Sequence, residues 1–233
     1  HGLLFWRSMT QWIGGLGIIM FTIAVLPIFG VSGLQVFAAE ASGPTHDKVH
    51  PRIGITAKWI WGIYTGLTFI LVILLMLGGM NWFDSICHAF ATTGTGGFST
   101  KQASVAYYHS PYIEYVISLF MFVSGINFTL LLFFVNRKFK KVIDNAELKW
   151  YFWSVTGFTT VIAVILYYTS SMGMEEAFRK SLFQVISLHT STGFATDDYM
   201  LWTPILWGLL TIVMIMGACA GSTTGGLKCI RMV

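Results

Sequence analysis

Residues 91–100, ATTGTGGFST, decide the fold of this chain. Four Thr, one Ser and three Gly stand together here without a charge, although long apolar runs flank them on both sides. This composition forms neither a good helix nor an ordinary turn, because Gly and Thr both disfavour helix interiors. The sequence therefore places polar, non-helical backbone within its most hydrophobic region.

The composition around this stretch is that of an integral membrane protein. The 233 residues are 55% hydrophobic and only 10% charged, and the mean hydropathy is +0.69. A soluble domain carries about 25% charged residues. The net charge of +4 predicts no nucleic-acid partner, because the basic residues lie between apolar runs and form no stripe. The three cysteines match neither a disulfide framework nor a metal site.

Five apolar runs are long enough, or nearly so, to cross a bilayer, which takes about 20 residues. Two shorter helix-like stretches, 81–92 and 174–190, are too short or too polar to span and are predicted to be re-entrant. Lys and Arg concentrate in the loops around 48–58 and 137–149 and after residue 227, which the positive-inside rule assigns to the cytoplasm. The predicted spanning helices are Met9–Gly30, Ile53–Gly79, Pro111–Asn136, Leu148–Ser170 and one from Leu201 to Met216.

The order of full helix, short helix, polar loop and full helix occurs twice. The loop at 93–100 follows the first short helix, and the loop at 191–196 follows the second. Gly97 and Phe98 align with Gly193 and Phe194. Each unit contains two crossings, so successive units enter the membrane in the same orientation, and the repeat is parallel.

Non-helical backbone at membrane depth is tolerated only where it is buried in protein or lines a water-filled cavity. A cation is the ligand that seeks carbonyl oxygens, and desolvating it costs on the order of 20 kcal/mol in an idealised low-dielectric interior. Rings of carbonyls can replace that hydration, and the negative helix ends favour a cation. A pair of Gly-rich hairpin turns is the simpler interpretation. The predicted ion-binding residues are Thr95, Gly96, Gly97, Phe98, Ser191, Thr192, Gly193 and Phe194, with K⁺ at Thr95, Gly96, Thr192 and Gly193.

A third unusual segment, GACAGSTTGGLK at 217–228, interrupts the last apolar run. It is not a P-loop, because Leu227 separates the final Gly from Lys228. One interpretation is a mobile loop that narrows the ion path, and the other is a plain helix end with a Gly cap. The candidate gating residues are Gly217, Ala218, Gly221, Ser222, Thr223, Thr224, Gly225, Gly226 and Lys228.

A few isolated polar residues have ordinary interpretations. Asp84 lies near the start of the first short helix, where an acid complements the helix dipole. Asn127 is predicted to join helices by a hydrogen bond. Asp197 and Asp198 follow the second polar loop, where they either attract cations to the pore entrance or are simply solvated.

The segments FWRSMTQWIGGLGIIM, TGGFST, TSTGFAT and GACAGSTTGGLKCIR, in this order, resemble the Trk/Ktr/HKT superfamily of potassium transporters, most closely its bacterial TrkH-type members. The resemblance covers essentially the whole chain. It implies an all-α membrane fold in which four such units surround one pore, with one filter glycine from each. Here Gly97 and Gly193 match the filter glycines of units two and three, and 217–226 matches the gating loop. Residues 1–52 then end unit one, 53–147 form unit two and 148–233 form most of unit three.

The resemblance also implies a homodimer in the cell inner membrane, regulated by a cytoplasmic nucleotide-binding ring subunit. The leading prediction is gated K⁺ uptake without a cofactor or enzymatic chemistry. A coupled secondary transporter of a small solute or Na⁺ is the alternative, although it would favour inverted repeats. An intramembrane enzyme would need a nucleophile with a base or a motif such as H-E-x-x-H, and the sequence contains neither.

Overall fold

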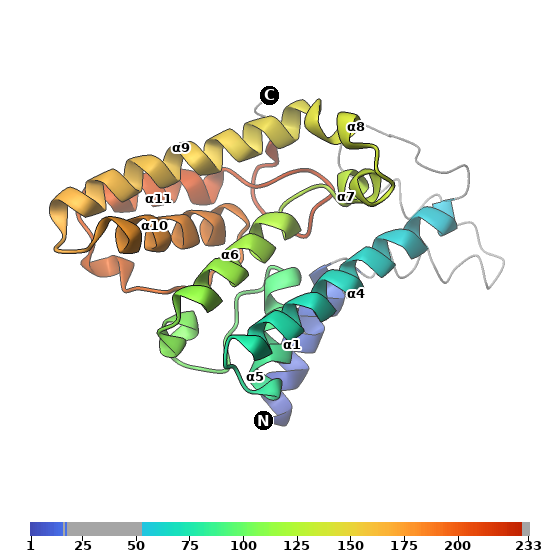
Figure 1. The fold of residues 1–233 in the computed structure, drawn as a ribbon, viewed down its shortest axis with the longest axis horizontal. Coiled ribbons are helices and arrows are strands. Elements are labelled where there is room, and N and C mark those ends of the chain that lie inside the picture. The colour runs from blue at the N-terminus through green and yellow to red at the C-terminus, as the bar shows by residue number, and fades with distance from the viewer. Residues whose placement is uncertain (16, 18–52, 230–233) are drawn as a thin grey trace.

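The computed structural model describes residues 1–229, apart from 16 and 18–52, as a set of packed helices (Figure 1). The described residues form no β-strand, and Met216 and Leu227 form an isolated bridge. Helix α1 (Gly2–Gly15) contains the start of the predicted helix Met9–Gly30. The rest of that helix, most of the predicted unit 1–52, and Lys48 and Arg52 lie outside the described residues.

The first repeat unit begins with α4 (Ile53–Leu77) and the short helix α5 (Trp82–Thr93). A 3₁₀ turn (Ser104–Tyr108) leads into α6 (Pro111–Ser124), which Pro111 starts because its ring fits the first helical position. Helix α7 (Phe128–Val135) and the short α8 (Phe139–Ile143) follow.

The second repeat unit has the same order. Helix α9 (Ala146–Thr169) begins at Asn145, whose side chain accepts a hydrogen bond of 2.9 Å from the Leu148 amide. The short helix α10 (Met174–His189) and a 3₁₀ turn (Tyr199–Leu201) precede α11 (Pro204–Ile215). Helices α5 and α10 confirm the two short helices that the sequence predicts.

Within the described residues, α9 and the Lys58–Leu77 part of α4 are long and apolar enough to cross a membrane. A third span exists if α6 and α7 count as one, but their axes differ by 102°. The predicted continuous helix Pro111–Asn136 is therefore wrong. The chain breaks at Gly125-Ile126-Asn127, where the Asn127 side chain caps α7 by accepting from the Thr129 amide at 2.8 Å. Asn127 thus starts a helix, and its role in joining helices stays a prediction.

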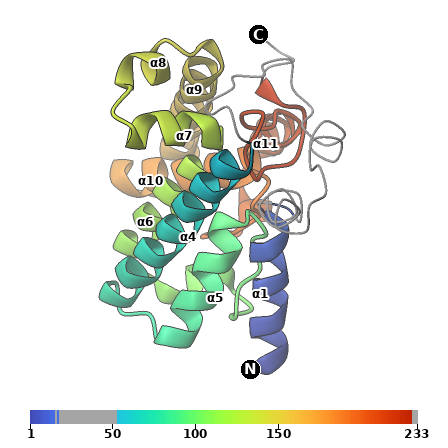
Figure 2. The ribbon, with the colours of Figure 1, turned by 90° about the vertical axis from the view of Figure 1, so that its right-hand side faces the viewer.

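The two units meet along α6, which lies between α9, α10 and α11 on one side and α1, α4 and α5 on the other (Figure 1). Helix α5 packs against both α1 and α4, and α10 packs against α9, α6 and α11 (Figure 2). Both short helices are therefore packed among other helices on several sides. The fully buried core at this junction includes Ile117, Met121, Tyr151, Phe183 and Phe194.

Candidate functional site

Each short helix ends in a polar loop, and the two loops follow the same backbone path. We call residues 94–100 the first polar loop and residues 190–196 the second. Thr95 and Ser191 have φ angles of 50° and 53°, and Gly97 and Gly193 have φ angles of 67° and 85°. A positive φ is uncommon for a residue with a Cβ. Its occurrence at the same two positions of each loop shows that the loops are structural repeats.

The loops also use their amide groups in the same way. The Gly96 amide donates to the Ala91 carbonyl and the Thr192 amide donates to the Ser187 carbonyl, both at 2.8 Å. The next amides, of Gly97 and Gly193, donate to the same two acceptors at 3.3 and 3.2 Å. Because the amides turn back to the short helices, the carbonyls face the other way. Among the described residues, no donor hydrogen-bonds to the carbonyls of Thr95, Thr192 or Gly193.

The two polar loops touch at their glycines. A Cβ built on Gly97 would lie 1.7 Å from the Thr192 carbonyl oxygen, so no other residue fits there. A Cβ on Gly193 would meet no described atom within 4 Å, so only its left-handed backbone favours glycine. The structure thus brings together the sequence-predicted residues of both loops, which are separated by almost a hundred positions.

The aligned aromatic residues of the two loops have different surroundings. Phe194 is fully buried and stacks on His88 of α5, with ring centroids 5.7 Å apart. Phe98 is 51% exposed and lies under the Arg7 guanidinium, 4.4 Å from the ring centroid. The ring of Phe194 therefore joins the second polar loop to the first short helix.

Helix α1 contributes two residues that the sequence analysis missed. Arg7 donates to the Ser99 carbonyl at 2.8 Å, and the Gln11 amide nitrogen lies 3.4 Å from the Gly96 carbonyl oxygen. A Cβ on Gly96 would lie 2.4 Å from the Gln11 side chain, so a larger residue there would require Gln11 to move. The signal was the presence of Arg7 and Gln11 in FWRSMTQW, next to a predicted membrane-spanning run.

An ion pair follows each polar loop. Lys101 pairs with Asp84 of α5 at 3.2 Å, and Asp197 pairs with Lys180 of α10 at 3.1 Å. Burial would raise the pKa of Asp84, but hydrogen bonds from Thr100 and Lys101 outweigh it and hold that pKa below its ordinary value. Burial would lower the pKa of Lys180, but its acidic neighbours, Glu176 and Asp197, raise it. Asp84 and Lys180 are therefore charged at neutral pH.

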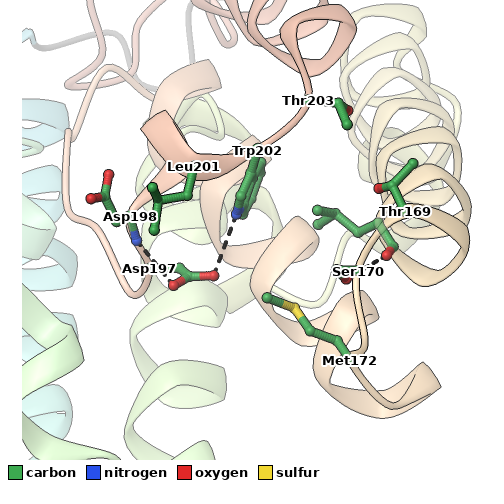
Figure 3. A pocket seen from close by; sticks show the side chains of 9 residues that line it. Thr169, Ser170, Met172, Asp197, Asp198, Leu201, Trp202 and Thr203 are labelled. Atoms are coloured by element: carbon green, nitrogen blue, oxygen red, sulfur yellow. Dashed lines mark hydrogen bonds between the residues drawn. The ribbon is translucent and has the colours of Figure 1, made fainter.

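The two acids after the second polar loop are engaged by neighbouring groups. Asp197 also accepts from the Trp202 indole at 3.3 Å (Figure 3). Asp198 accepts from the Met200 amide at 3.1 Å. A cavity of about 150 Å³ lies beside them, lined mainly by residues from the end of α9 and from the segment before α11. This cavity contains none of the predicted ion-binding residues.

The interrupted segment, residues 217–228, which we call the break loop, contacts both polar loops. The Thr95 hydroxyl donates to the Thr223 carbonyl at 2.9 Å, and the Gly225 amide donates to the Ser191 hydroxyl at 2.7 Å. Thr95 and Ser191 are the aligned residues with positive φ. The break loop thus binds the same position of each polar loop.

Three amides hold the break loop in place. The Gly217 amide donates to the Leu227 carbonyl within the loop at 2.8 Å. The Ala220 amide donates to the Glu147 carboxylate of α9 at 2.6 Å, and the Cys219 amide donates to the Gly125 carbonyl of the first repeat unit at 3.1 Å. Helix α11 ends at Met216 in extended backbone, not at a left-handed glycine, so the Gly-cap interpretation is wrong.

The remaining candidate gating residues lie within this loop. Ala218 is fully buried, Ser222 and Thr224 share a hydrogen bond of 2.8 Å, and the Lys228 ammonium donates to the Thr224 carbonyl. The left-handed glycines are Gly221 and Gly226.

Comparisons with known proteins agree with this geometry. The family model TrkH, described as a cation transport protein, matches residues 1–233. The Trk system potassium uptake protein TrkH of Escherichia coli K12 is 40% identical over all of the chain and 49% of that protein. The protein of that name from Halomonas elongata is 36% identical over 100% of the chain and 49% of its own length.

A solved structure gives the same result. The crystal structure of the potassium transporter TrkH from Vibrio parahaemolyticus matches 99% of the chain and 47% of its own, with a TM-score of 0.82 and 35% identity. The chain thus spans about half the length of the relatives it matches. These findings confirm the predicted all-α fold and the predicted multi-pass location in the inner membrane. They also confirm the prediction that the chain comes from a transport protein and not from an enzyme. The chain belongs to the TrkH family of cation transport proteins.

Proposed function

We propose that the complete protein takes up K⁺ through a gated pore lined by backbone carbonyls. This chain contributes the first and second polar loops to the pore, and we call them its two filter strands. The repeated left-handed geometry of the two polar loops carries this proposal. Their amides bond to the short helices, which leaves carbonyls of Thr95, Thr192 and Gly193 available. Carbonyl oxygens in a ring can replace the hydration shell of a monovalent cation.

The proposed binding positions are the four that the sequence predicts, and of these the Gly96 carbonyl oxygen also lies 3.4 Å from the Gln11 amide nitrogen. The carbonyls of Thr95 and Gly96 in the first strand and of Thr192 and Gly193 in the second are proposed to bind K⁺. The relatives named as potassium uptake proteins favour K⁺ as the ion. In this proposal K⁺ is the transported substrate, and the protein uses no cofactor.

The break loop is proposed to be the gate. It hydrogen-bonds to the aligned residues Thr95 and Ser191, so it lies at the end of both strands that adjoins the short helices. An ion leaving the strands on this side must pass the loop, and displacement of the loop would open the path. The complete protein is further proposed to form a homodimer and to bind a cytoplasmic nucleotide-binding ring subunit, as the resemblance to its family implies.

Flux of Rb⁺ and Na⁺ through proteoliposomes that contain the full-length protein tests the proposal. We expect Rb⁺ flux well above Na⁺ flux, and a smaller ratio in Gly193→Ser. A matched control is Gly208→Ser on α11, where an added Cβ also meets no described atom within 4 Å and φ is not positive. Equal fluxes in the unmodified protein, or an unchanged ratio in Gly193→Ser, would contradict the proposal.

A further inference from the structure

The two ion pairs that follow the polar loops occupy the same positions of the repeat with opposite polarity. Lys180 lies 96 positions after Asp84, and Asp197 lies 96 positions after Lys101, the separation that relates Gly193 to Gly97. The acid is on the short helix in the first unit and directly after the polar loop in the second. The N···O distances are nearly equal, at 3.2 and 3.1 Å. Both repeats therefore have an ion pair at these two positions, although the acid and the base have exchanged places.

The lengths of the short helices explain why the polarity can differ. Asp84 lies in the first turn of α5, where an acid is favoured by the helix dipole. Helix α10 begins earlier relative to the repeat, and Glu175 and Glu176 occupy its first turn. Lys180 therefore lies beyond the positive end of the dipole, which would have disfavoured a lysine at the position of Asp84.

The neighbouring threonines show the same reversal. Thr100 donates to Asp84 at 2.5 Å, because a carboxylate faces it. Its equivalent, Thr196, directly precedes the partner of Lys180, and its buried hydroxyl has no hydrogen-bond partner among the described residues. The second unit has thus kept the ion pair at the expense of this hydrogen bond.

Each ion pair attaches the residue that follows a filter strand to the short helix that precedes that strand. At the other end the strand is held to the short helix by the amides of residues 96 and 97, or 192 and 193. Lys101 and Asp197 each lie four positions beyond the glycine. The side chains of Asp84 and Lys180 are only 6% and 15% exposed, so water screens the pairs less than it screens a surface pair.

We propose that Asp84, Lys101, Lys180 and Asp197 are positioning residues for ion selection, which fasten each filter strand to its short helix and so set the spacing of the carbonyls. This inference rests on the proposed pore function. The pairs act through the strand and do not touch the ion. Loss of an ion pair should therefore change the preference between ions of different size while the amount of folded protein changes little.

The test uses the full-length protein in proteoliposomes and compares Rb⁺ with Na⁺ flux in Lys101→Gln and Asp197→Asn. We expect the flux ratio to fall by roughly two- to fivefold in each, the range that a partly exposed ion pair supports, with a raised KM for Rb⁺. The matched control is Glu176→Gln, which removes the 2.9 Å pair of the same Lys180 within α10 and leaves the strand fastened. Its ratio should not change.

The reversed double variant Lys180→Asp with Asp197→Lys gives the second unit the polarity of the first, and it puts no lysine into the first turn of a helix. We expect it to recover most of the ratio lost in Asp197→Lys alone. A double variant that assembles without recovery, or fails to assemble, would overturn the inference. So would a fall in both fluxes with an unchanged ratio in the single variants.

The two proposals fail in different ways. If the unmodified protein does not favour Rb⁺, or Gly193→Ser keeps the full ratio, the pore function itself is wrong and this inference is overturned with it. If Gly193→Ser loses the ratio while Lys101→Gln and Asp197→Asn keep it, the pore function stands and the positioning role is wrong.

Discussion

Two aligned glycines in this chain are required for different physical reasons. Gly97 has no room for a side chain, because a Cβ would lie 1.7 Å from the Thr192 carbonyl oxygen. Gly193 has room but a φ of 85°. The sequence alignment pairs the two residues correctly, yet it gives no sign of this difference, because the contact joins segments far apart in the chain.

We therefore expect Gly97→Ser to be more damaging than Gly193→Ser. The left-handed conformation costs a residue with a Cβ about 1–2 kcal/mol, which Gly193→Ser can tolerate as a folded but less selective protein. Gly97→Ser must in addition displace the neighbouring strand. Thermal unfolding in detergent should show a much larger fall for Gly97→Ser, and equal losses would contradict the steric argument.

At the scale of elements, the break loop and the polar loops share hydrogen bonds that no sequence pattern predicts. Thr95 and Thr223, and Ser191 and Gly225, come from elements that only the folded structure brings together. The short helices and the repeated loops were predictable, because glycine, threonine and length are local signals. The break at Gly125-Ile126-Asn127 was not predicted, because a glycine and an asparagine also occur inside continuous membrane helices.

Releasing the break loop should raise flux when the proposed gate is closed. Thr95→Val keeps the shape of the side chain but removes the donor to the Thr223 carbonyl, and Ser191→Ala removes the acceptor for the Gly225 amide. Each hydrogen bond contributes about 1 kcal/mol, so the open fraction should rise roughly fivefold for each. Rb⁺ flux measured without any regulatory subunit checks this. Thr211→Val, whose hydroxyl bonds only within α11 at 2.8 Å, is the control.

The attachment of the break loop to α9 should be visible in stability. Glu147 accepts from the Ala220 amide at 2.6 Å and is only 8% exposed. Glu147→Ala would remove a charged acceptor, and the free energy of unfolding should fall by about 1.5–3 kcal/mol. Glu147→Gln retains an acceptor and should lose less. Unfolding in detergent would measure both, and equal losses would show that the hydrogen bond is not the cause.

For the whole molecule, a buried ion pair joins the two repeat units. Arg179 of α10 pairs with Glu114 of α6, and their side chains are 11% and 7% exposed. Arg179 also bonds to Glu175, which is 62% exposed and 2.9 Å away. The sequence identified both units but not this connection, because the partners lie on different units and neither belongs to a recognisable motif.

Removing one partner should loosen the contact between units. We expect Arg179→Met to lower the free energy of unfolding by about 3–5 kcal/mol, because Glu114 would remain buried without its counter-charge. The control Glu175→Gln breaks only the exposed pair and should cost less than about 1 kcal/mol. The double variant Arg179→Met with Glu114→Leu should regain stability. If it is no more stable than Arg179→Met, the uncompensated charge is not the cause.

The broken connection between α6 and α7 has a consequence for hydration. Its Gly125 carbonyl accepts from the Cys219 amide at 3.1 Å, and its Phe128 amide donates to the Gly221 carbonyl at 3.2 Å, so each interrupted segment satisfies the other. If the break loop moved away in a dry interior, four backbone groups would lose their partners at several kcal/mol each. Water would remove most of that cost. Water must therefore enter the space around the bend whenever the loop moves. An apolar substitution that keeps this space dry would prevent the loop from moving, even if the new side chain does not itself lie in the ion path.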